Sequence, residues 1–234
     1  SLYQPVYGTD DDLVLYLPFS ENLINISNTT YDRSPYGNDG TLNNMNYGDA
    51  TVENRQNNTG WAPGKYGTAM VFDGSNDFIN VSDGGSLSIT DAITVEVWAK
   101  YDTHSETYPI LLEKKYDTTY TLHAGNTGAD IGKPWWRVWT SGGATGVLST
   151  IDTDDGKWHY IVGTYDMNAG SNNVKLYIDG VLNNQATETG AIATTTDPLL
   201  IGRSTNPGDF FNGTIDEVKI YKRALSPEEI RTHT

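Results

Sequence analysis

The sequence contains no cysteine, which excludes thiol catalysis and cysteine-ligated zinc sites. It also excludes disulfides, although a chain of 234 residues can bury a full core without them, so the cellular compartment stays open. No apolar run approaches the ~18 residues of a membrane span, and the first residues do not form a signal peptide. We interpret the chain as a segment excised from a larger exported or surface-anchored protein, with no direct membrane insertion.

Positive charge is scarce as well. The chain has 30 acidic and 15 basic residues, a formal net charge of −15. The lysines and arginines form no cluster that could displace counterions from phosphates, so we expect no binding to nucleic acid. Glycine and tyrosine are abundant, at 24 and 15 residues, and this composition favours short strands and turns over helices.

Recognisable catalytic motifs are missing too. The nearest approach to a phosphate-binding loop, residues 128–134, is one residue too short and ends in Pro134 where serine or threonine is required. A retaining glycosidase needs two carboxylates ~5 Å apart. In the strand-like segment from Ile93 to Lys100, Glu96 is the only carboxylate. We therefore expect no enzymatic activity.

Short apolar segments separated by turn residues run through most of the chain. The first extends from Leu13 to Phe19, with Pro18 indicating an edge or a bulge. Two short strands are expected near 40–42 and 51–53. Further strands are predicted at residues 69–72, 78–81, 93–99, 110–113, 120–124, 136–140, 147–151, 158–166, 174–178, 199–201 and 215–221. This spacing is typical of an antiparallel sandwich, and we predict one domain with its core at about 13–230.

The C-terminal segment has two distinctive signals. Apolar and polar residues alternate from Thr214 to Tyr221 with one slip in phase, which predicts a half-buried strand. Ser226, Pro227 and Glu229 then form the signature of a helix start with a capping box.

Three segments together resemble a known family: Phe210 to Ile230, Gly67 to Ile79, and Gly156 to Tyr160. They are similar to the LamG-like, concanavalin A-like jelly-roll domains, over nearly the whole chain. The resemblance implies an all-β antiparallel sandwich with one short C-terminal helical turn. It also implies an extracellular or cell-surface unit that binds carbohydrate or another surface.

An aromatic platform beside polar groups is the usual basis of sugar binding. Strict alternation in residues 135–139 places Trp135, Arg137 and Trp139 on one face and Trp136 with Val138 on the other, more core-like face. We predict that the first three bind a ligand on a concave sheet face. The alternative is that they pack between sheets. Further candidates are Tyr108, Tyr116, His123, Trp61 and Phe210.

Glu96 and Trp98 share a strand face, while Val95 and Val97 point to the core. One interpretation places Glu96 on the solvated outer face, paired with Lys100. The other places Glu96 and Trp98 in the ligand groove.

Calcium is the predicted cofactor, because it prefers carboxylate and carbonyl oxygens. Asp73 and Asp77 flank a Gly-Ser-Asn turn. The resemblance adds Asp216 of an Asp-x-Val-Lys-x-Tyr strand, with carbonyl ligands from Gly74 and from around Pro18. Alternatively, Asp73 and Asp77 only cap turns and Asp216 pairs with a basic residue.

These observations favour a non-catalytic, calcium-stabilised module that binds a glycan or another surface polymer, within a protein that has other domains. A structural or adhesive spacer without glycan binding and a polysaccharide-active enzyme with an unfamiliar site remain the alternatives.

Overall fold

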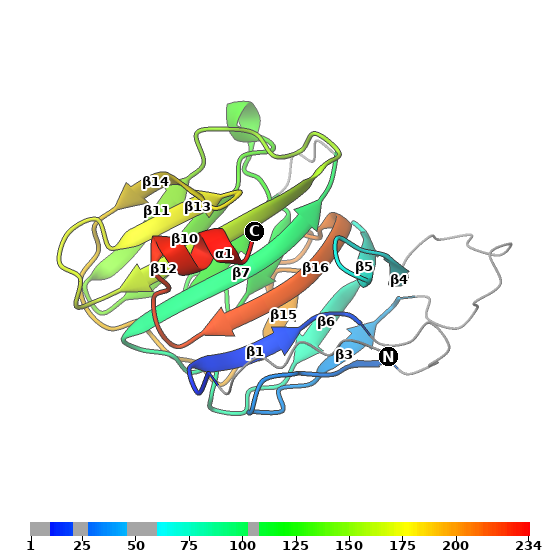
Figure 1. Ribbon diagram of the computed structural model, residues 1–234, viewed down its shortest axis with the longest axis horizontal. Helices are drawn as coiled ribbons and strands as arrows, with labels where there is room; N and C mark the ends of the chain where they lie inside the picture. Colours follow the sequence, from blue (N-terminus) through cyan, green and yellow to red (C-terminus); the bar gives the residue numbers. More distant parts are fainter. Residues whose placement is uncertain (1–9, 21–27, 46–59, 103–107) are drawn as a thin grey trace, which may run out of the picture.

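Two antiparallel β-sheets stacked face to face form the body of the protein (Figure 1). The structure is a computed structural model and describes residues 10–20, 28–45, 60–102 and 108–234. The expected strand at 51–53 lies outside the described residues. Within the described residues, no helix is long and apolar enough to cross a membrane.

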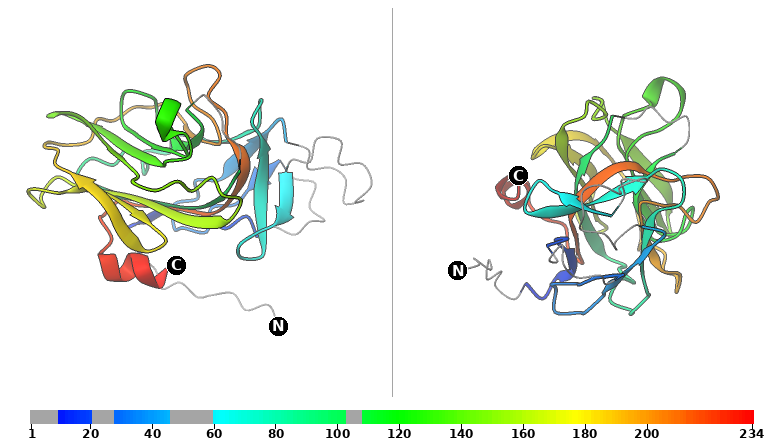
Figure 2. Two further views of the ribbon diagram at one scale, coloured as in Figure 1. Left: turned by 90° about the horizontal axis from the view of Figure 1, so that it is seen from above. Right: turned by 90° about the vertical axis from the view of Figure 1, so that its right-hand side faces the viewer.

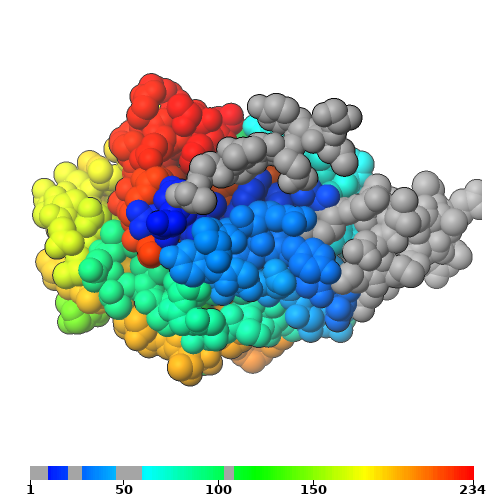
Figure 3. All heavy atoms as spheres, turned by 60° about the horizontal axis from the view of Figure 1, so that its bottom comes forward, coloured from blue at the N-terminus to red at the C-terminus, as the bar shows by residue number. Residues whose placement is uncertain are grey.

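The first sheet, sheet A, has the strand order β14-β13-β12-β7-β16-β5-β4, and β1 also pairs with β16. Its strands are β1 (Leu13–Leu17), β4 (Gly60–Pro63), β5 (Thr68–Asp73), β7 (Ala92–Lys100), β12 (Trp158–Asp166), β13 (Val174–Ile178), β14 (Val181–Ala186) and β16 (Asn212–Tyr221). The first described strand therefore lies beside the last one. In Figure 3 the blue surface of the N-terminal segment accordingly meets the orange-red and red surface of the C-terminal segment.

The second sheet, sheet B, has the order β11-β10-β9-β8-β15-β6-β3-β2. Its strands are β2 (Thr29–Thr30), β3 (Gly40–Asn43), β6 (Phe78–Val81), β8 (Ile110–Glu113), β9 (Tyr120–His123), β10 (Trp135–Thr140), β11 (Gly143–Leu148) and β15 (Leu199–Ile201). A short 3-10 helix, η1 (Gly128–Asp130), precedes β10.

The core lies between the two sheets. Alternate residues of each strand point inward, so that Val95 and Val97 of β7 meet Trp136 and Val138 of β10 in one cluster of fully buried side chains. Gly163 of β12 allows this packing, because a Cβ atom there would lie 2.3 Å from the Trp136 ring. Burial of large apolar side chains is the main stabilising contribution to such a sandwich.

Helix α1 (Pro227–Thr232) lies against the outer face of sheet A, on the side away from sheet B (Figure 2). Ser226 and Glu229 form the predicted capping box, and Pro227 occupies the first turn. Ile230 is fully buried in a second cluster with Leu13, Trp98 and Tyr160. The outer face of sheet A is therefore partly covered.

The predicted all-β fold is confirmed, and so are the bounds of five strands: β6, β8, β12, β13 and β15. The segment predicted at 147–151 was misplaced, because the Ser141-Gly142 turn starts β11 at Gly143. Strands β2, β4 and β14 were missed. No residue of β14 is buried, and its polar residues are consecutive, so it lacks the apolar alternation that a half-buried strand shows.

The phase slip predicted in the last strand is a β-bulge. The pairing of β16 with β7 shifts register between Asp216 and Lys219, and Glu217 has a φ of 51°. Such a bulge adds one residue on one strand and re-aims the side chains around it. As a result Ile215 and Val218 both join the core, while the two residues between them do not.

Candidate functional site

Trp135, Arg137 and Trp139 form a continuous ladder on the outer face of sheet B. Each is partly exposed, whereas Trp136 and Val138 between them are fully buried, as predicted. The Arg137 guanidinium carbon lies 4.3 Å from the ring centre of Trp135 and 4.3 Å from that of Trp139. Two cation–π contacts therefore hold the arginine between two indoles. We call these three residues the Trp–Arg–Trp ladder.

Neighbouring strands complete the surroundings of the ladder. Trp135 pairs with His123 of β9, and Arg137 pairs with Thr121 of β9 and with Gly146 of β11. A Cβ atom on Gly146 would lie 2.4 Å from Nε1 of Trp135, so the indole lies directly over this glycine. The missing side chain at Gly146 therefore leaves the space that the Trp135 ring occupies.

Three of the five further aromatic candidates lie around the ladder, whereas Trp61 contacts Phe19 and Phe210 contacts Arg203. Tyr116 lies 6.3 Å from Trp139 between ring centres, His123 lies 5.3 Å from Trp135, and Tyr108 lies 6.1 Å from His123. Burial, with a smaller effect from Arg137, lowers the pKa of His123 to about 3. The imidazole is thus neutral at physiological pH. Its Nε2 lies 2.9 Å from the Thr121 hydroxyl, while its buried Nδ1 has no hydrogen-bond partner among the described residues.

Sequence reasoning missed Glu113, a buried carboxylate on this side of sheet B. Glu113 belongs to β8 and pairs with Thr121 of β9, the strand next to the ladder strand β10. Its two oxygens accept four hydrogen bonds, from the backbone amides of Tyr116 and Thr205 and from the hydroxyls of Thr205 and Ser204, at 2.7–3.0 Å. These donors compensate for burying the charge and fix two loops beside the ladder. A single Glu at the end of an apolar strand was the only signal in the sequence.

Glu96 and Trp98 do not belong to this site. They share a strand face, as predicted, but that face is the outer side of sheet A, on the opposite side of the sandwich. The predicted groove combining Trp98 and Glu96 with the ladder is therefore wrong. The idea of a solvated Glu96 paired with Lys100 is also wrong, because Glu96 is fully buried and lies 3.0 Å from Nδ1 of His233.

The residues predicted to bind calcium fall into two places. Asp73, Gly74 and Asp77 form one turn after β5. Asp73 Oδ1 accepts bonds from the amides of Ser75 and Asn76, and Asp77 Oδ2 accepts one from the amide of Asp73. This is the turn-capping alternative. Asp73 pairs with Asn212 of β16. Asp216 lies four residues further along that strand, which places it roughly 13 Å from Asn212 and so from the turn that contains Asp73. One site containing all five predicted residues is therefore wrong.

Asp216 has a different environment, beside Trp98 on sheet A. Its carboxylate is fully buried and accepts hydrogen bonds from the amides of Tyr66 and Glu217, at 3.0 and 2.8 Å. Burial raises the pKa of Asp216 to about 7. Pro18 follows Leu17, the partner of Val218, and so lies near the same bulge. Among the described residues, no group of three or more acidic or histidine side chains is arranged to hold a metal.

The comparisons with known proteins agree with this architecture. The family model described as the concanavalin A-like lectin/glucanases superfamily matches residues 73–231, more than half of the chain. The chain belongs to this superfamily. A search of curated proteins at the sequence level found no match.

Several solved structures of domains from larger proteins have the same fold. The binding domain of Paraclostridial Mosquitocidal Protein 1 is 15% identical, with a TM-score of 0.72, over 97% of this chain and 52% of that one. Domain 4 of AbnA, a GH43 extracellular arabinanase from Geobacillus stearothermophilus in complex with arabinotriose, is 21% identical, with a TM-score of 0.66, over 94% and 97%. The binding domain of botulinum neurotoxin DC in complex with SialylT is 14% identical, with a TM-score of 0.66, over 95% and 50%.

These likenesses concern the fold alone, since identities are low. This concanavalin A-like domain spans about half the length of the toxin binding domains that it matches, and nearly all of the arabinanase domain.

Proposed function

We propose that this concanavalin A-like domain is a non-catalytic carbohydrate-binding module and that its glycan lies along the Trp–Arg–Trp ladder. The observation that carries the proposal is the guanidinium of Arg137, held at 4.3 Å between two partly exposed indoles. Indole rings offer apolar faces and edges to the C–H groups of a sugar. Because its flat faces are covered, Arg137 presents the N–H groups of its edge to sugar hydroxyls.

The charge around the ladder supports a ligand rich in hydroxyl groups. Asp117 lies 3.6 Å from Arg137, between Oδ1 and Nη1. An acceptor and a donor at this separation match two neighbouring hydroxyls of a sugar ring, and a few such polar groups fix the orientation of a stacked ligand. In this proposal Trp135 and Trp139 supply contact area, while Arg137 and Asp117 supply orientation.

The environment of the buried carboxylates supports a binding role over a catalytic one. A glycosidase needs an acid and a base or nucleophile that can reach the scissile bond. Glu113, the buried carboxylate of the ladder face, uses both oxygens for four hydrogen bonds to the protein. Glu96 lies on the other sheet, buried beneath the end of α1. Neither is placed to exchange a proton with a sugar on the ladder.

We also propose that calcium stabilises the fold through Asp216, with carbonyl oxygens near Pro18. The support is a buried carboxylate with no lysine, arginine or histidine within ion-pair distance among the described residues. Hard cations prefer oxygen ligands of this kind. Asp73, Gly74 and Asp77 are not part of this site.

The wider context of the module is part of the same proposal. The arabinanase domain that shares this fold belongs to an enzyme described as extracellular and carries bound arabinotriose, and the toxin domains are parts of larger chains. By analogy, this domain acts outside the cell or on its surface, attached to other domains of a parent protein, and recognises a glycan.

Affinity electrophoresis through gels that contain soluble polysaccharides, together with a glycan array, tests the proposal. The wild-type domain is expected to be retarded by at least one polysaccharide. Gly146→Ala is expected to lose that retardation, because the new methyl group displaces the Trp135 indole above it. Absence of retardation on every polysaccharide, or full retention of binding by Gly146→Ala, would contradict the proposal.

A further inference from the structure

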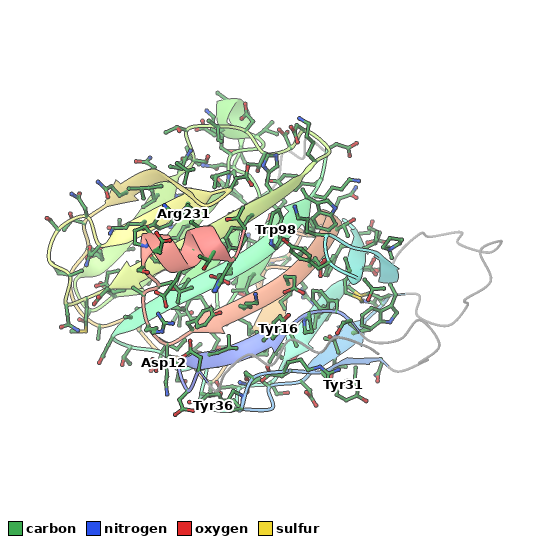
Figure 4. The ribbon with its side chains drawn as sticks, viewed as in Figure 1. Asp12, Tyr16, Tyr31, Tyr36, Trp98 and Arg231 are labelled. Atoms are coloured by element: carbon green, nitrogen blue, oxygen red, sulfur yellow. The ribbon has the colours of Figure 1, made fainter. Side chains whose placement is uncertain are left out.

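A pocket lies on the side of the sandwich opposite to the ladder, beside the end of α1. It has a volume of about 370 Å³, which is within the range of small-ligand sites, and its main lining residues are Tyr16, Tyr66, Trp98, Glu217, Lys219 and His233. Trp98 projects from β7 and Tyr16 from β1 on the face that carries α1 (Figure 4). We call this cavity the sheet A pocket.

The polar side chains of the sheet A pocket are nearly buried, and hydrogen bonds and ion pairs fix their positions. Glu217 and Lys219 are 9% and 8% exposed. Glu217 Oε2 accepts a hydrogen bond from the Tyr16 hydroxyl at 2.9 Å and lies 3.6 Å from Nζ of Lys219. The β-bulge in β16 brings Glu217 there, at a left-handed φ of 51° that is uncommon for a residue with a side chain. Backbone conformations of this kind are often found at functional sites.

The aromatic groups form the wall next to these charges. Trp98 stacks on Tyr160 with 5.3 Å between ring centres, and Tyr66 meets its ring edge-on at 6.0 Å. The Tyr66 side chain is 46% exposed and stands at the rim. The pocket therefore combines an aromatic wall with an acceptor and a donor side by side, the combination that suits a sugar ring.

The charged side chains around the sheet A pocket indicate which class of ligand it can bind. A quaternary ammonium or other cation would be repelled by two positive charges that already lie on the aromatic rings: Nζ of Lys65 lies 4.0 Å from the ring centre of Trp98, and Nζ of Lys219 lies 4.9 Å from that of Tyr16. An anion would meet Glu217 together with the buried carboxylates of Asp216 and Glu96 nearby. A neutral polyhydroxy ligand avoids both conflicts.

We propose that the sheet A pocket is a second carbohydrate site and that it takes a neutral monosaccharide unit, with Glu217 accepting from and Lys219 donating to its hydroxyls. This site is independent of the Trp–Arg–Trp ladder, which lies on the other sheet. The domain would then contact sugar on both of its faces and could connect two glycan chains.

Nuclear magnetic resonance titration of the Trp98 indole N–H signal, assigned with Trp98→Phe, tests this proposal. The probes are glucose, galactose, mannose, xylose and arabinose, with choline and glucuronate as the cationic and anionic alternatives. At least one neutral sugar is expected to give a saturable shift. Tyr66→Ala and Glu217→Gln are expected to weaken that binding about tenfold, the usual effect of losing an important contact.

Two matched controls separate this site from the ladder. Trp135→Ala removes a ladder indole, and Tyr31→Ala removes an exposed tyrosine elsewhere, so both are expected to leave the titration of Trp98 unchanged. The proposal is overturned if no neutral sugar shifts Trp98, if choline or glucuronate binds there instead, or if both pocket variants titrate like the wild type. Loss of polysaccharide retention in Trp135→Ala bears on the ladder alone.

Discussion

The carboxylate of Glu96, in the middle of β7, lies 3.0 Å from Nδ1 of His233, 137 residues further along the chain. Glu96 is fully buried, and its register partner on β16 is Lys219. His233 follows α1 directly, so this contact connects the end of the helix to the centre of sheet A. Glu96 therefore has a structural task that explains its burial without a role in catalysis.

Glu96→Ala is expected to lower the free energy of unfolding by about 2–3 kcal/mol, because it removes the hydrogen bond with His233 from a buried site and leaves the imidazole without that partner. Urea unfolding measures this change. Glu228→Ala is the matched control: its side chain is 68% exposed and pairs with Arg231 on the surface, so a change within ~0.5 kcal/mol is expected. Equal midpoints for Glu96→Ala and wild type would show that the contact contributes nothing to stability.

His159 supplies a pH-dependent contribution. Its Nδ1 lies 2.9 Å from Asp179 and its Nε2 lies 3.1 Å from Asp155, and the hydrogen bond with Asp179 is the main cause of a raised pKa for His159. A raised pKa in the folded state means that the stabilisation is complete below the unfolded pKa of ~6.5 and is lost as pH rises through the folded pKa. Its size is at most ~1 kcal/mol, because both aspartates are partly exposed.

We expect the contribution of His159 to be visible in melting temperatures measured in steps from pH 5 to pH 9. The quantity to compare is the difference between the wild type and His159→Gln at each pH. The wild type is expected to be the more stable of the two at the acidic end, and the difference is expected to shrink at the alkaline end. A difference that is constant, or that grows with pH, would be inconsistent with an ionised pair at His159.

Removal of calcium tests the proposed role of Asp216. If calcium binds only the folded state, a hundredfold excess over its dissociation constant adds ~2.7 kcal/mol of stability. The melting temperature is expected to rise from EDTA to excess calcium for the wild type and for Asp73→Asn, because Asp73 only caps a turn. Asp216→Asn is expected to show no rise. Identical melting curves of the wild type in EDTA and in calcium would refute the metal proposal.

Sequence reasoning succeeded where a local pattern and its burial coincide. Alternation in residues 135–139 predicted which side of β10 is core, and the phase slip near Asp216 predicted an irregular strand that is a β-bulge. The capping residues Ser226 and Glu229 likewise gave the start of α1. In each case, neighbours in the chain decide the structure.

The failures at the candidate sites concern contacts between distant segments. The alternation of β7 placed Glu96 on an outer face, but a periodic pattern cannot tell which sheet contains the strand or that α1 covers it. The predicted calcium ligands combined the turn at Asp73 with Asp216 of β16. The pairing of Asp73 with Asn212 places these two positions four residues apart along the strand. Glu113 was missed because its four donors come from loops up to 92 residues away along the chain.

The central claim is that the Trp–Arg–Trp ladder binds a glycan, and the most direct measurement is isothermal titration calorimetry of ladder variants with a saccharide that the wild type retains. Trp135→Ala and Trp139→Ala are each expected to lose more than ~1 kcal/mol of binding free energy, because a stacked aromatic anchor is truncated. Their melting temperatures are expected to stay near that of the wild type, and Tyr31→Ala is expected to bind normally. The account is contradicted if both ladder variants bind like the wild type, or if they lose the ~3–5 kcal/mol of stability expected for a core tryptophan.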